Sequence, residues 1–323
     1  MSDETTEKTR KERSLDDDDK TQATPIKPRF APDDERGAFL IVLSGASIGK
    51  MHRLPDGTST LGRSRKCTVV LEEEGVSRIH ARVEVDGDET RISDNESTNG
   101  TFVNGQKLAD GKEPVLRDGD RIMLGGSMVL RFSLQDELDE AFQQQLYESA
   151  VRDGLTGAYN KRYLLERLDQ EFSYAERHGT PLSIIVLDLD HFKRVNDQHG
   201  HAVGDEVLRA VSEAIKGAAR AEDIFARYGG EEFVLMMRET SLHDTMRYAD
   251  RLRILLSELD IEAGTADPIR ISCSLGVAST DGAWHKSGRR LFVKADRNLY
   301  QAKQSGRNCV FGPDRAKTDP GIA

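Results

Sequence analysis

The spacing of hydrophobic residues divides the chain into parts with different periods. Between Ala38 and Phe132, short apolar runs of β type alternate with turns rich in Gly, Asn and Asp, and no helical period is visible. Many short strands at close spacing are typical of a β-sandwich. The pattern therefore predicts an all-β domain over residues 37–132.

A helix is predicted directly after this domain. Apolar residues recur at steps of three and four from Leu134 to Ala150, which is the period of an amphipathic helix. We assign this linker helix to residues 133–152. Its apolar face could pack on a neighbouring domain, or it could pair with the same helix of a second copy, and the pattern allows both.

Strands and helices are mixed over residues 153–313. The predicted segments are strand 181–190, helix 202–219, strands 224–228 and 233–237, helix 241–259, strand 269–279 and helix 288–306. Ser241 is expected to cap one helix and Gly306 to close the last. The order βαββαβ predicts an α/β domain of the ferredoxin or palm type, with helices against one sheet.

Composition excludes several classes of function. With 46 basic and 56 acidic residues among 323, the formal net charge is −10, so the chain repels nucleic-acid backbones and no nucleic-acid partner is expected. The longest apolar run, Ala38 to Leu43, has six residues, whereas a membrane-spanning helix needs about 20. No membrane association is therefore expected.

The chain ends and the cysteines predict a cytoplasmic protein. The first residues are charged and contain no apolar stretch, so no secretory signal is predicted. Cys67, Cys273 and Cys309 are isolated, without the spacing of a disulfide framework or a zinc site. Residues 1–36 form a Thr-containing segment with too little apolar surface to fold, and we expect a disordered tail there and a second tail at 314–323.

Polar residues suited to phosphate binding occupy turns of the predicted sandwich. Arg63 and Arg78 offer forked donors that match phosphate oxygens, and Ser77 and Thr98 add hydroxyl groups. Asn99 can bind a peptide backbone through its amide group. Each of the three motifs by itself is also typical of an ordinary turn.

In this order, the motifs resemble those of the forkhead-associated (FHA) domain, over nearly all of residues 38–132. The resemblance implies a two-sheet sandwich that binds phosphothreonine peptides. Asn99 would contact the peptide backbone, and His80 would be structural and brace the loops. The residues expected to contact the phosphate are Arg63, Ser77, Arg78 and Thr98.

Acidic residues end the strand at 181–190 and follow a glycine turn. Asp188 and Asp190 lie at the strand end, and Gly229-Gly230-Glu231-Glu232 forms the turn. Carboxylates beside an apolar strand are costly without a cation, and Mg²⁺ takes one or two carboxylates while keeping positions for substrate phosphates. Glycines leave space for a nucleotide. A solvated acidic surface is the alternative that these residues alone allow.

A wider set of motifs resembles the GGDEF-domain diguanylate cyclases across residues 150–313. The motifs are DGLTG at 153–157, DLDHFK at 188–193, Asn196, Gly200-His201, Gly204-Asp205, RYGGEEF at 227–233 and AKQSGRN at 302–308. GGEEF is an accepted form of the family signature. The family makes cyclic di-GMP from two GTP molecules and releases two pyrophosphates.

The resemblance implies a role for each matching position. Asp188, Glu231 and Glu232 would be catalytic and, with the backbone carbonyl of Leu189, would bind two Mg²⁺ or Mn²⁺ ions per active site. The substrate site would consist of Asn196, Asp205, Lys193, Phe192, Gly229, Gly230, Lys303 and Arg307. Asn196 and Asp205 would contact guanine, and the three basic residues would bind the phosphates. The histidines His191, His199 and His201 would be loop residues.

An inhibitory site and a dimer are also implied. Arg220 and Asp223 form an Arg-x-x-Asp motif nine residues before the signature, which resembles the family's inhibitory site for its own product, and Arg251 could complete it. A surface ion pair is the alternative. Each subunit would hold one GTP, so catalysis would require a homodimer.

The FHA resemblance implies control by a Ser/Thr kinase. The phosphothreonine ligand could come from another protein or from this chain's own tail, which contains Thr5, Thr6, Thr9, Thr21 and Thr24. An alternative function for the whole chain is a phospho-dependent adaptor that binds GTP or cyclic di-GMP without turnover.

Overall fold

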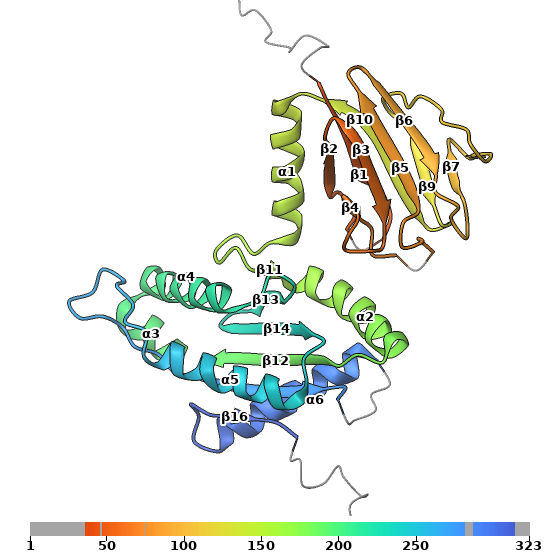
Figure 1. Cartoon of the computed structure of the whole chain (residues 1–323). Helices are drawn as coiled ribbons and strands as arrows, with labels where there is room; N and C mark the ends of the chain where they lie inside the picture. The colour runs from red at the N-terminus through yellow and green to blue at the C-terminus, as the bar shows by residue number, and fades with distance from the viewer. Residues whose placement is uncertain (1–35, 46, 74, 282–286, 314–323) are drawn as a thin grey trace, which may run out of the picture.

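Two domains joined by a helix make up the computed structural model (Figure 1). The structure describes residues 36–45, 47–73, 75–281 and 287–313, so the two predicted tails lie outside the described residues except for Arg36. Within the described parts, no helix is long and apolar enough to cross a bilayer.

The N-terminal domain is the predicted β-sandwich. Its sheets have the strand orders β2-β1-β10-β9-β7-β8 and β4-β3-β5-β6. Alternate residues face the core, as in β5, where Ala81, Val83 and Val85 are buried and the residues between them are exposed. The strands are β1 Gly37–Val42, β2 Met51–Leu54, β3 Gly57–Gly62, β4 Val69–Val70, β5 Ala81–Asp86, β6 Glu89–Asp94, β7 Thr101–Val103, β8 Gln106–Lys107, β9 Arg121–Leu124 and β10 Met128–Gln135.

Helix α1 (Glu137–Val151) begins four residues after the expected position. Strand β10 continues to Gln135 and pairs with β1, so Leu134 packs on the sandwich core and not on the helix. The side chain of Asp136 caps α1 by accepting a hydrogen bond from the backbone N–H of Asp139. The strong β pairing, which the helical spacing of Leu134 concealed, determines this boundary.

The two sides of α1 have different surroundings. One side faces the sandwich, where Glu140 forms an ion pair with Arg53 of β2. On the other side, Leu138, Phe142 and Leu146 are 75%, 58% and 48% exposed. The apolar stripe of α1 is therefore not packed against its own chain in the described structure.

The C-terminal domain has a six-stranded sheet of order β11-β13-β14-β12-β15-β16. Its four central strands are antiparallel and follow the predicted ferredoxin-like βαββαβ order. The strands are β11 Tyr159–Asn160, β12 Leu182–Leu189, β13 Ile224–Gly229, β14 Glu232–Arg238, β15 Cys273–Ser279 and β16 Val310–Phe311. The central strand, β12, is buried along its whole length.

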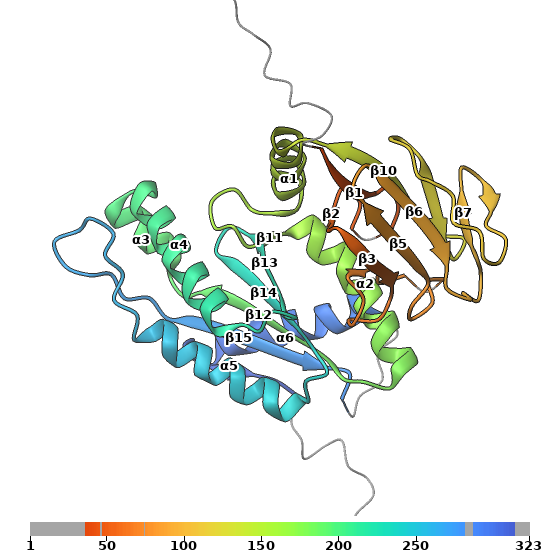
Figure 2. The same ribbon diagram turned by 45° about the horizontal axis from the view of Figure 1, so that its top comes forward.

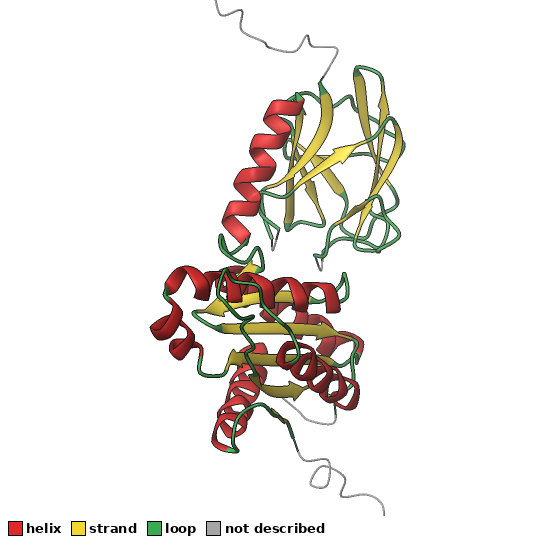
Figure 3. Cartoon of the chain, turned by 90° about the vertical axis from the view of Figure 1, so that its left-hand side faces the viewer, coloured by secondary structure: helices red, strands yellow, loops and turns green. Residues whose placement is uncertain are grey.

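Helices cover both faces of this sheet (Figure 3). One core joins the sheet to α4 and α5, through residues such as Val211 and Leu252, and the other joins it to α2 and α6, through residues such as Leu164 and Leu299. Ser241 caps α5, as predicted. The helices are α2 Lys161–His178, α3 Phe192–His199, α4 His201–Ala218, α5 Leu242–Ser257 and α6 Gly288–Gln304. Helices α2 and α3 were not among the predicted segments.

Candidate functional site

Strand pairing brings the acidic residues together at one end of the central strands; we call this end, with Asp188, Glu231 and Glu232, the acidic strand end. Asp188, near the end of β12, lies directly opposite Glu232, the first residue of β14. Glu231 precedes Glu232 in the turn, and its carbonyl accepts a hydrogen bond of 3.3 Å from the backbone N–H of Leu189. Figure 1 shows this end of β12 on the side of α3, away from the N-terminal domain.

The carboxylates are crowded, and one basic residue reaches them. Burial raises the pKa of Asp188, while Lys303, whose Nζ lies 2.7 Å from Oδ2 of Asp188, opposes the rise. Burial and then the charge of Asp188 raise the pKa of Glu232. Burial and the neighbouring carboxylates therefore disfavour the ionised forms, and a bound divalent cation would offset this cost.

Asp190 differs from Asp188 although both lie at the same strand end. Its Oδ1 accepts a hydrogen bond of 2.6 Å from Ser274, and its Oδ2 accepts hydrogen bonds of 2.7 Å from Ser272 and 3.0 Å from the backbone N–H of Asn308. The side chain is 4% exposed. Asp190 therefore connects β12 to β15 and to the loop after α6, and its oxygens are already satisfied.

The glycine turn is open and is held from behind. Gly230 has a φ of +52°, and a Cβ at Gly229 or Gly230 would meet no atom within 4 Å. Arg227 donates to the carbonyl of Gly230 at 2.7 and 2.9 Å and pairs with Asp153 at 3.1 Å. The sequence motifs included both Arg227 and Asp153 but did not indicate this brace.

Helices α3 and α4 position the residues expected to contact guanine. Gly204 of α4 lies so close to α3 that a Cβ there would be 1.9 Å from Oδ1 of Asn196 and 3.2 Å from the ring of Phe192. Asp205 follows in α4 and is half-buried, and Phe192 is buried in the core. The missing side chain of Gly204 therefore brings Asn196 and Asp205 onto adjacent turns of two packed helices.

The predicted phosphate-binding residues lie around the acidic strand end and differ in exposure and contacts. Lys303, in the last turn of α6, contacts Asp188 directly. Lys193 is exposed in the first turn of α3. Arg307 is exposed in the loop whose next residue, Asn308, is bonded to Asp190. Two of the three basic side chains are thus free to turn toward a ligand.

The residues of the possible inhibitory site meet around Tyr248, which sequence analysis did not identify. The backbone N–H of Arg220 donates to Oδ2 of Asp223 at 2.9 Å, and the guanidinium of Arg251 lies 5.4 Å from the Tyr248 ring. Burial raises the pKa of Asp223 and that of Tyr248, the latter to about 12. Among the described residues, Oδ1 of Asp223 and the Tyr248 hydroxyl are buried without a hydrogen-bond partner.

In the parts described, protein side chains alone do not form a complete metal site. Across 36–45, 47–73, 75–281 and 287–313, no group of three or more His, Cys, Asp and Glu side chains is placed to hold a metal ion. Mg²⁺ does not require such a group, because one or two carboxylates and the substrate phosphates suffice.

Loops at one end of the sandwich gather the residues expected to bind phosphothreonine. His80 joins two of these loops, since its Nδ1 accepts from the backbone N–H of Ser77 at 2.9 Å and its Nε2 lies 3.1 Å from the carbonyl of Gly100. The hydroxyl of Ser77 accepts from the backbone N–H of Thr98 at 3.1 Å. His80 therefore has the bracing contacts expected of it.

The arginines of this loop end are exposed, and Asn99 is partly engaged. Arg63 and Arg78 both face solvent. Their loops approach closely, because a Cβ at Gly62 would be 2.3 Å from the carbonyl of Arg78. Asn99 donates from Nδ2 to the carbonyl of Gly75 at 3.0 Å. The described loops thus present two free guanidinium groups beside two hydroxyls.

Comparison with known families and proteins agrees with both halves of this description. Residues 150–309 match the family described as diguanylate cyclase, GGDEF domain, and residues 59–125 match the FHA domain. The chain is 39% identical over 173 residues to diguanylate cyclase DosC of Escherichia coli strain K12, covering 54% of this chain and 37% of DosC. It is 40% identical over 180 residues to response regulator PleD of Caulobacter vibrioides, covering 55% and 38%. The chain therefore spans less than two fifths of the length of these relatives.

Solved structures show the same similarity. The coiled coil and GGDEF domain of DgcB from Caulobacter crescentus, in complex with c-di-GMP, matches 55% of this chain and 93% of that chain at 30% identity, with a TM-score of 0.51. Diguanylate cyclase SiaD of Pseudomonas aeruginosa, in complex with its activator SiaC, matches 55% and 67% at 34% identity, with a TM-score of 0.50.

Proposed function

This chain belongs, through its C-terminal domain, to the GGDEF diguanylate cyclase family, and we propose that it condenses two molecules of GTP into cyclic di-GMP and two pyrophosphates. The observation that carries the proposal is the pairing of Asp188 with Glu232 across β12 and β14, next to Glu231 and an open glycine turn. Their raised pKa values and the contact with Lys303 support a site for divalent cations and a triphosphate.

Two Mg²⁺ or Mn²⁺ ions per active site would be held by Asp188, Glu231, Glu232 and the backbone carbonyl of Leu189. When bound, the ions neutralise charge on the triphosphate and lower the pKa of the attacking ribose hydroxyl. Lys303 already supplies one positive charge at Asp188. Lys193 and Arg307 would add two more on the phosphates of the same GTP.

In each half-reaction the 3′-oxygen of one GTP forms a bond to the α-phosphorus of the other, and the bond from that phosphorus to pyrophosphate breaks. Where Glu232 does not hold the second ion, it would instead take the proton of the 3′-hydroxyl, a role suited to a carboxylate whose pKa is raised by burial. Two such steps close the ring. Because each subunit binds one GTP, positioning of two half-sites is the main requirement.

Guanine selection would depend on Asn196 and Asp205. A carboxylate accepts hydrogen bonds from the N–H groups of guanine, where adenine presents an acceptor. Leaving such a buried group unpaired costs about 1–3 kcal/mol. The close contact of α3 with Gly204 supports this arrangement, because it places both side chains on neighbouring turns.

The decisive experiment is conversion of GTP to cyclic di-GMP by the purified chain with Mg²⁺, followed by chromatography. Asp188→Asn and Glu231→Gln are expected to lower turnover by at least about a hundredfold, the scale of losing one charge-stabilising group. If the parent chain binds GTP or cyclic di-GMP without forming product, the adaptor function replaces the cyclase.

We further propose that the catalytic form is a homodimer assembled through α1. The exposed stripe of Leu138, Phe142 and Leu146 supports this proposal, because a contiguous apolar face on one helix is typical of a helix-pairing surface. Of the two sequence alternatives, pairing with a second copy thus has the better support.

Control by two ligands completes the proposal. The FHA domain would bind a phosphothreonine peptide, supplied by a Ser/Thr kinase acting on the tail or on another protein, through Arg63, Ser77, Arg78, Thr98 and Asn99. Cyclic di-GMP would bind at Arg220, Asp223 and Arg251, where the unpaired Oδ1 of Asp223 supports a ligand site.

Each control site has a direct test. Arg78→Ala should abolish the binding of threonine-phosphorylated tail peptides, as measured by calorimetry. Equal binding by the parent and the variant would reject the proposed phosphothreonine site. Arg220→Ala should leave the initial rate intact and remove its inhibition by added cyclic di-GMP. Equal sensitivity of the parent and the variant would reject the inhibitory site.

A further inference from the structure

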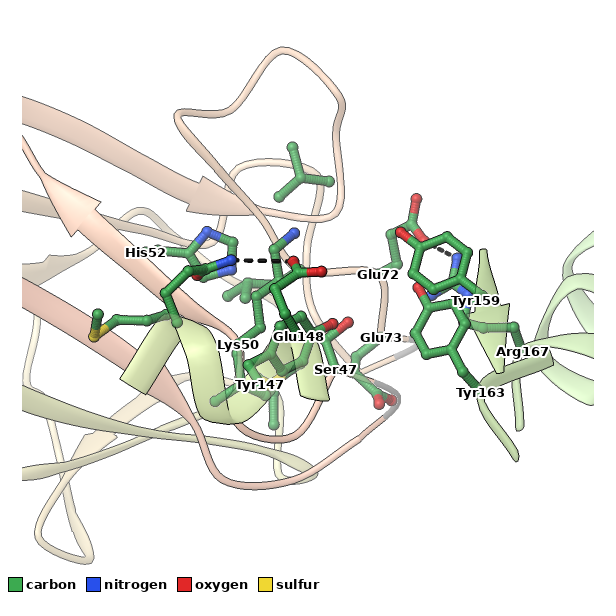
Figure 4. A pocket seen from close by; sticks show the side chains of 16 residues that line it. Ser47, Lys50, His52, Glu72, Glu73, Tyr147, Glu148, Tyr159, Tyr163 and Arg167 are labelled. Carbon is green, nitrogen blue, oxygen red and sulfur yellow. Dashed lines mark hydrogen bonds and ion pairs between the residues drawn. The ribbon is translucent and has the colours of Figure 1, made fainter. Parts of the chain in front are cut away.

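Four charged side chains meet where the two domains touch. Glu72 lies in the loop that joins β4 to β5 of the FHA domain, and its Oε2 is 2.7 Å from Nη2 of Arg167 in α2 (Figure 4). Glu72 also accepts two hydrogen bonds, of 3.0 and 3.1 Å, from Arg238 at the end of β14. Both arginines pair in addition with Glu171 of α2.

The charge balance of this cluster depends on the FHA domain. Within the cyclase domain, Arg167 and Arg238 share the single carboxylate of Glu171, and the three side chains are only 8%, 15% and 3% exposed. In the docked arrangement, one of these two positive charges would lack a carboxylate partner without Glu72, and an unpaired, poorly solvated charge is costly. Glu72 neutralises it. Although burial alone would raise the pKa of Glu72, the two arginines lower it to about 2, so the carboxylate is ionised at neutral pH.

The loop that carries Glu72 also carries part of the proposed phosphothreonine site. Ser77 and Arg78 lie at its far end, and Asn99 holds its middle by donating to the carbonyl of Gly75 at 3.0 Å. A peptide that binds to these residues thus acts on the same short segment that contacts the cyclase domain.

The contact between Glu72 and the cyclase domain does not cover the acidic strand end. Arg238 ends β14, whereas Glu232 begins it, and seven residues of strand span about 20 Å. Figures 1 and 2 show α3 on the side of the cyclase domain away from the FHA domain. Glu72 can therefore influence catalysis through the placement of the whole cyclase domain, and not by blocking substrate.

The surrounding interface is loosely packed. A cavity of about 300 Å³ lies beside the cluster and is lined by both domains and by α1, including His52, Tyr147 and Tyr163 (Figure 4). Close-packed apolar contact is what makes a domain interface permanent, and a hollow polar one is easily opened. The ion pairs of Glu72 are thus well placed to decide whether the domains stay docked.

We propose that Glu72 is a latch: it docks the FHA domain on Arg167 and Arg238 and thereby restrains the cyclase domain in a position of low turnover. The restraint adds a second attachment to the covalent one at residues 152–158, so the cyclase domain cannot turn about that segment to meet its partner. The effect on turnover rests on the proposed cyclase activity, whereas the docking itself does not.

Hydrogen exchange of the full-length chain tests the docking without any ligand or activity. Glu72→Gln should increase amide exchange severalfold in residues 71–73 and 161–178, and Glu73→Gln, which removes a charge from the same loop but none of these ion pairs, should not. Glu72→Arg should open the interface, and adding Arg238→Glu should restore protection because the cluster is neutral again. Unchanged exchange in Glu72→Gln would overturn the latch.

The initial rate of cyclic di-GMP formation tests the restraint. Glu72→Gln should turn over severalfold faster than the parent, with Glu73→Gln equal to the parent. An equal or lower rate in Glu72→Gln would overturn the restraint. If neither the parent nor the variant forms product but exchange increases, the proposed cyclase function fails and the docking by Glu72 stands.

Discussion

Asp188 and Asp190 are two residues apart on one strand, yet their surroundings give them opposite roles. Asp190 accepts three hydrogen bonds, whereas Asp188 is opposed by another carboxylate and meets one lysine. Sequence reasoning from the strand end proposed both as candidate carboxylates, and only the family motif separated them. The physical difference comes from Ser272, Ser274 and Asn308, which lie far along the chain, and nothing in the sequence indicates that they bond to Asp190.

Asp190→Asn should therefore destabilise the fold. The amide N–H₂ would face donors, and one unsatisfied buried pair costs about 1–3 kcal/mol. Asp188→Asn is the matched control. Because the pKa of Asp188 is raised in the folded chain, its ionised form costs stability at neutral pH, and the neutral amide removes that cost. Urea unfolding should show a lower midpoint for Asp190→Asn alone; equal midpoints would contradict this assignment.

The raised pKa values of Asp188 and Glu232 predict how the cation requirement depends on pH. Protons compete with Mg²⁺ for these carboxylates, and a raised pKa moves the competition to higher pH than for an ordinary Asp or Glu. The Mg²⁺ concentration for half-maximal rate should thus increase as the pH falls from neutral toward 5. A requirement that stays constant over this range would contradict the prediction.

At the scale of elements, the contact between α3 and α4 depends on one missing side chain. Gly204→Ala would place a Cβ 1.9 Å from Oδ1 of Asn196 and separate the helices. We expect a destabilisation of about 1–3 kcal/mol. We also expect the KM for GTP to increase about tenfold, the equivalent of ~1.4 kcal/mol.

Gly217→Ala in the same helix provides the control. A Cβ there meets no atom within 4 Å, so the change should stabilise α4 by about 0.5–1 kcal/mol and leave KM unchanged. Thermal unfolding and initial rates measure both effects. Similar KM values for the two variants would show that the helix contact does not position the substrate.

Element prediction succeeded where period and capping agreed, misplaced a boundary where two patterns conflicted, and omitted one helix whose signals are clear. The alternating burial of β5 and the cap of Ser241 on α5 follow local rules. Helix α1 starts later than expected because Leu134 fits the helical spacing but pairs in β10. Helix α2, which the predicted segments omitted, has recognisable signals, since Asn160 caps its start and Gly179 ends it in the left-handed region.

At the scale of the whole molecule, the dimer proposal predicts a concentration-dependent enzyme. Phe142→Glu puts a charge into the exposed stripe of α1 and should shift the chain to monomer in light scattering, with turnover per chain reduced at least about tenfold, because aligned half-sites are worth several kcal/mol. Val115→Glu, at an apolar position of the FHA domain that is 41% exposed, serves as the control. A dimeric and active Phe142→Glu chain would reject pairing through α1.

The contact between domains was the part that sequence could not predict. Glu72 and Arg238 are 166 residues apart, and each is one charged residue among many. The hydrophobic period of an element shows which of its faces packs on its own core. Two folded domains that dock through a few polar groups leave no such pattern in the sequence. The residues of the acidic strand end were predictable because they lie in family motifs. Glu72 lies in no such motif.

The buried course of β12 has a consequence for how such a protein can be controlled. This strand lies in the middle of the sheet, bonded to a neighbour on each side and covered by helices above and below. A change in the conformation of β12 would disturb two cores at once, so Asp188 at its end is held rigidly in the domain. If the proposed cyclase activity and homodimer hold, a regulatory signal must therefore move the whole domain as a rigid body, toward or away from the second copy.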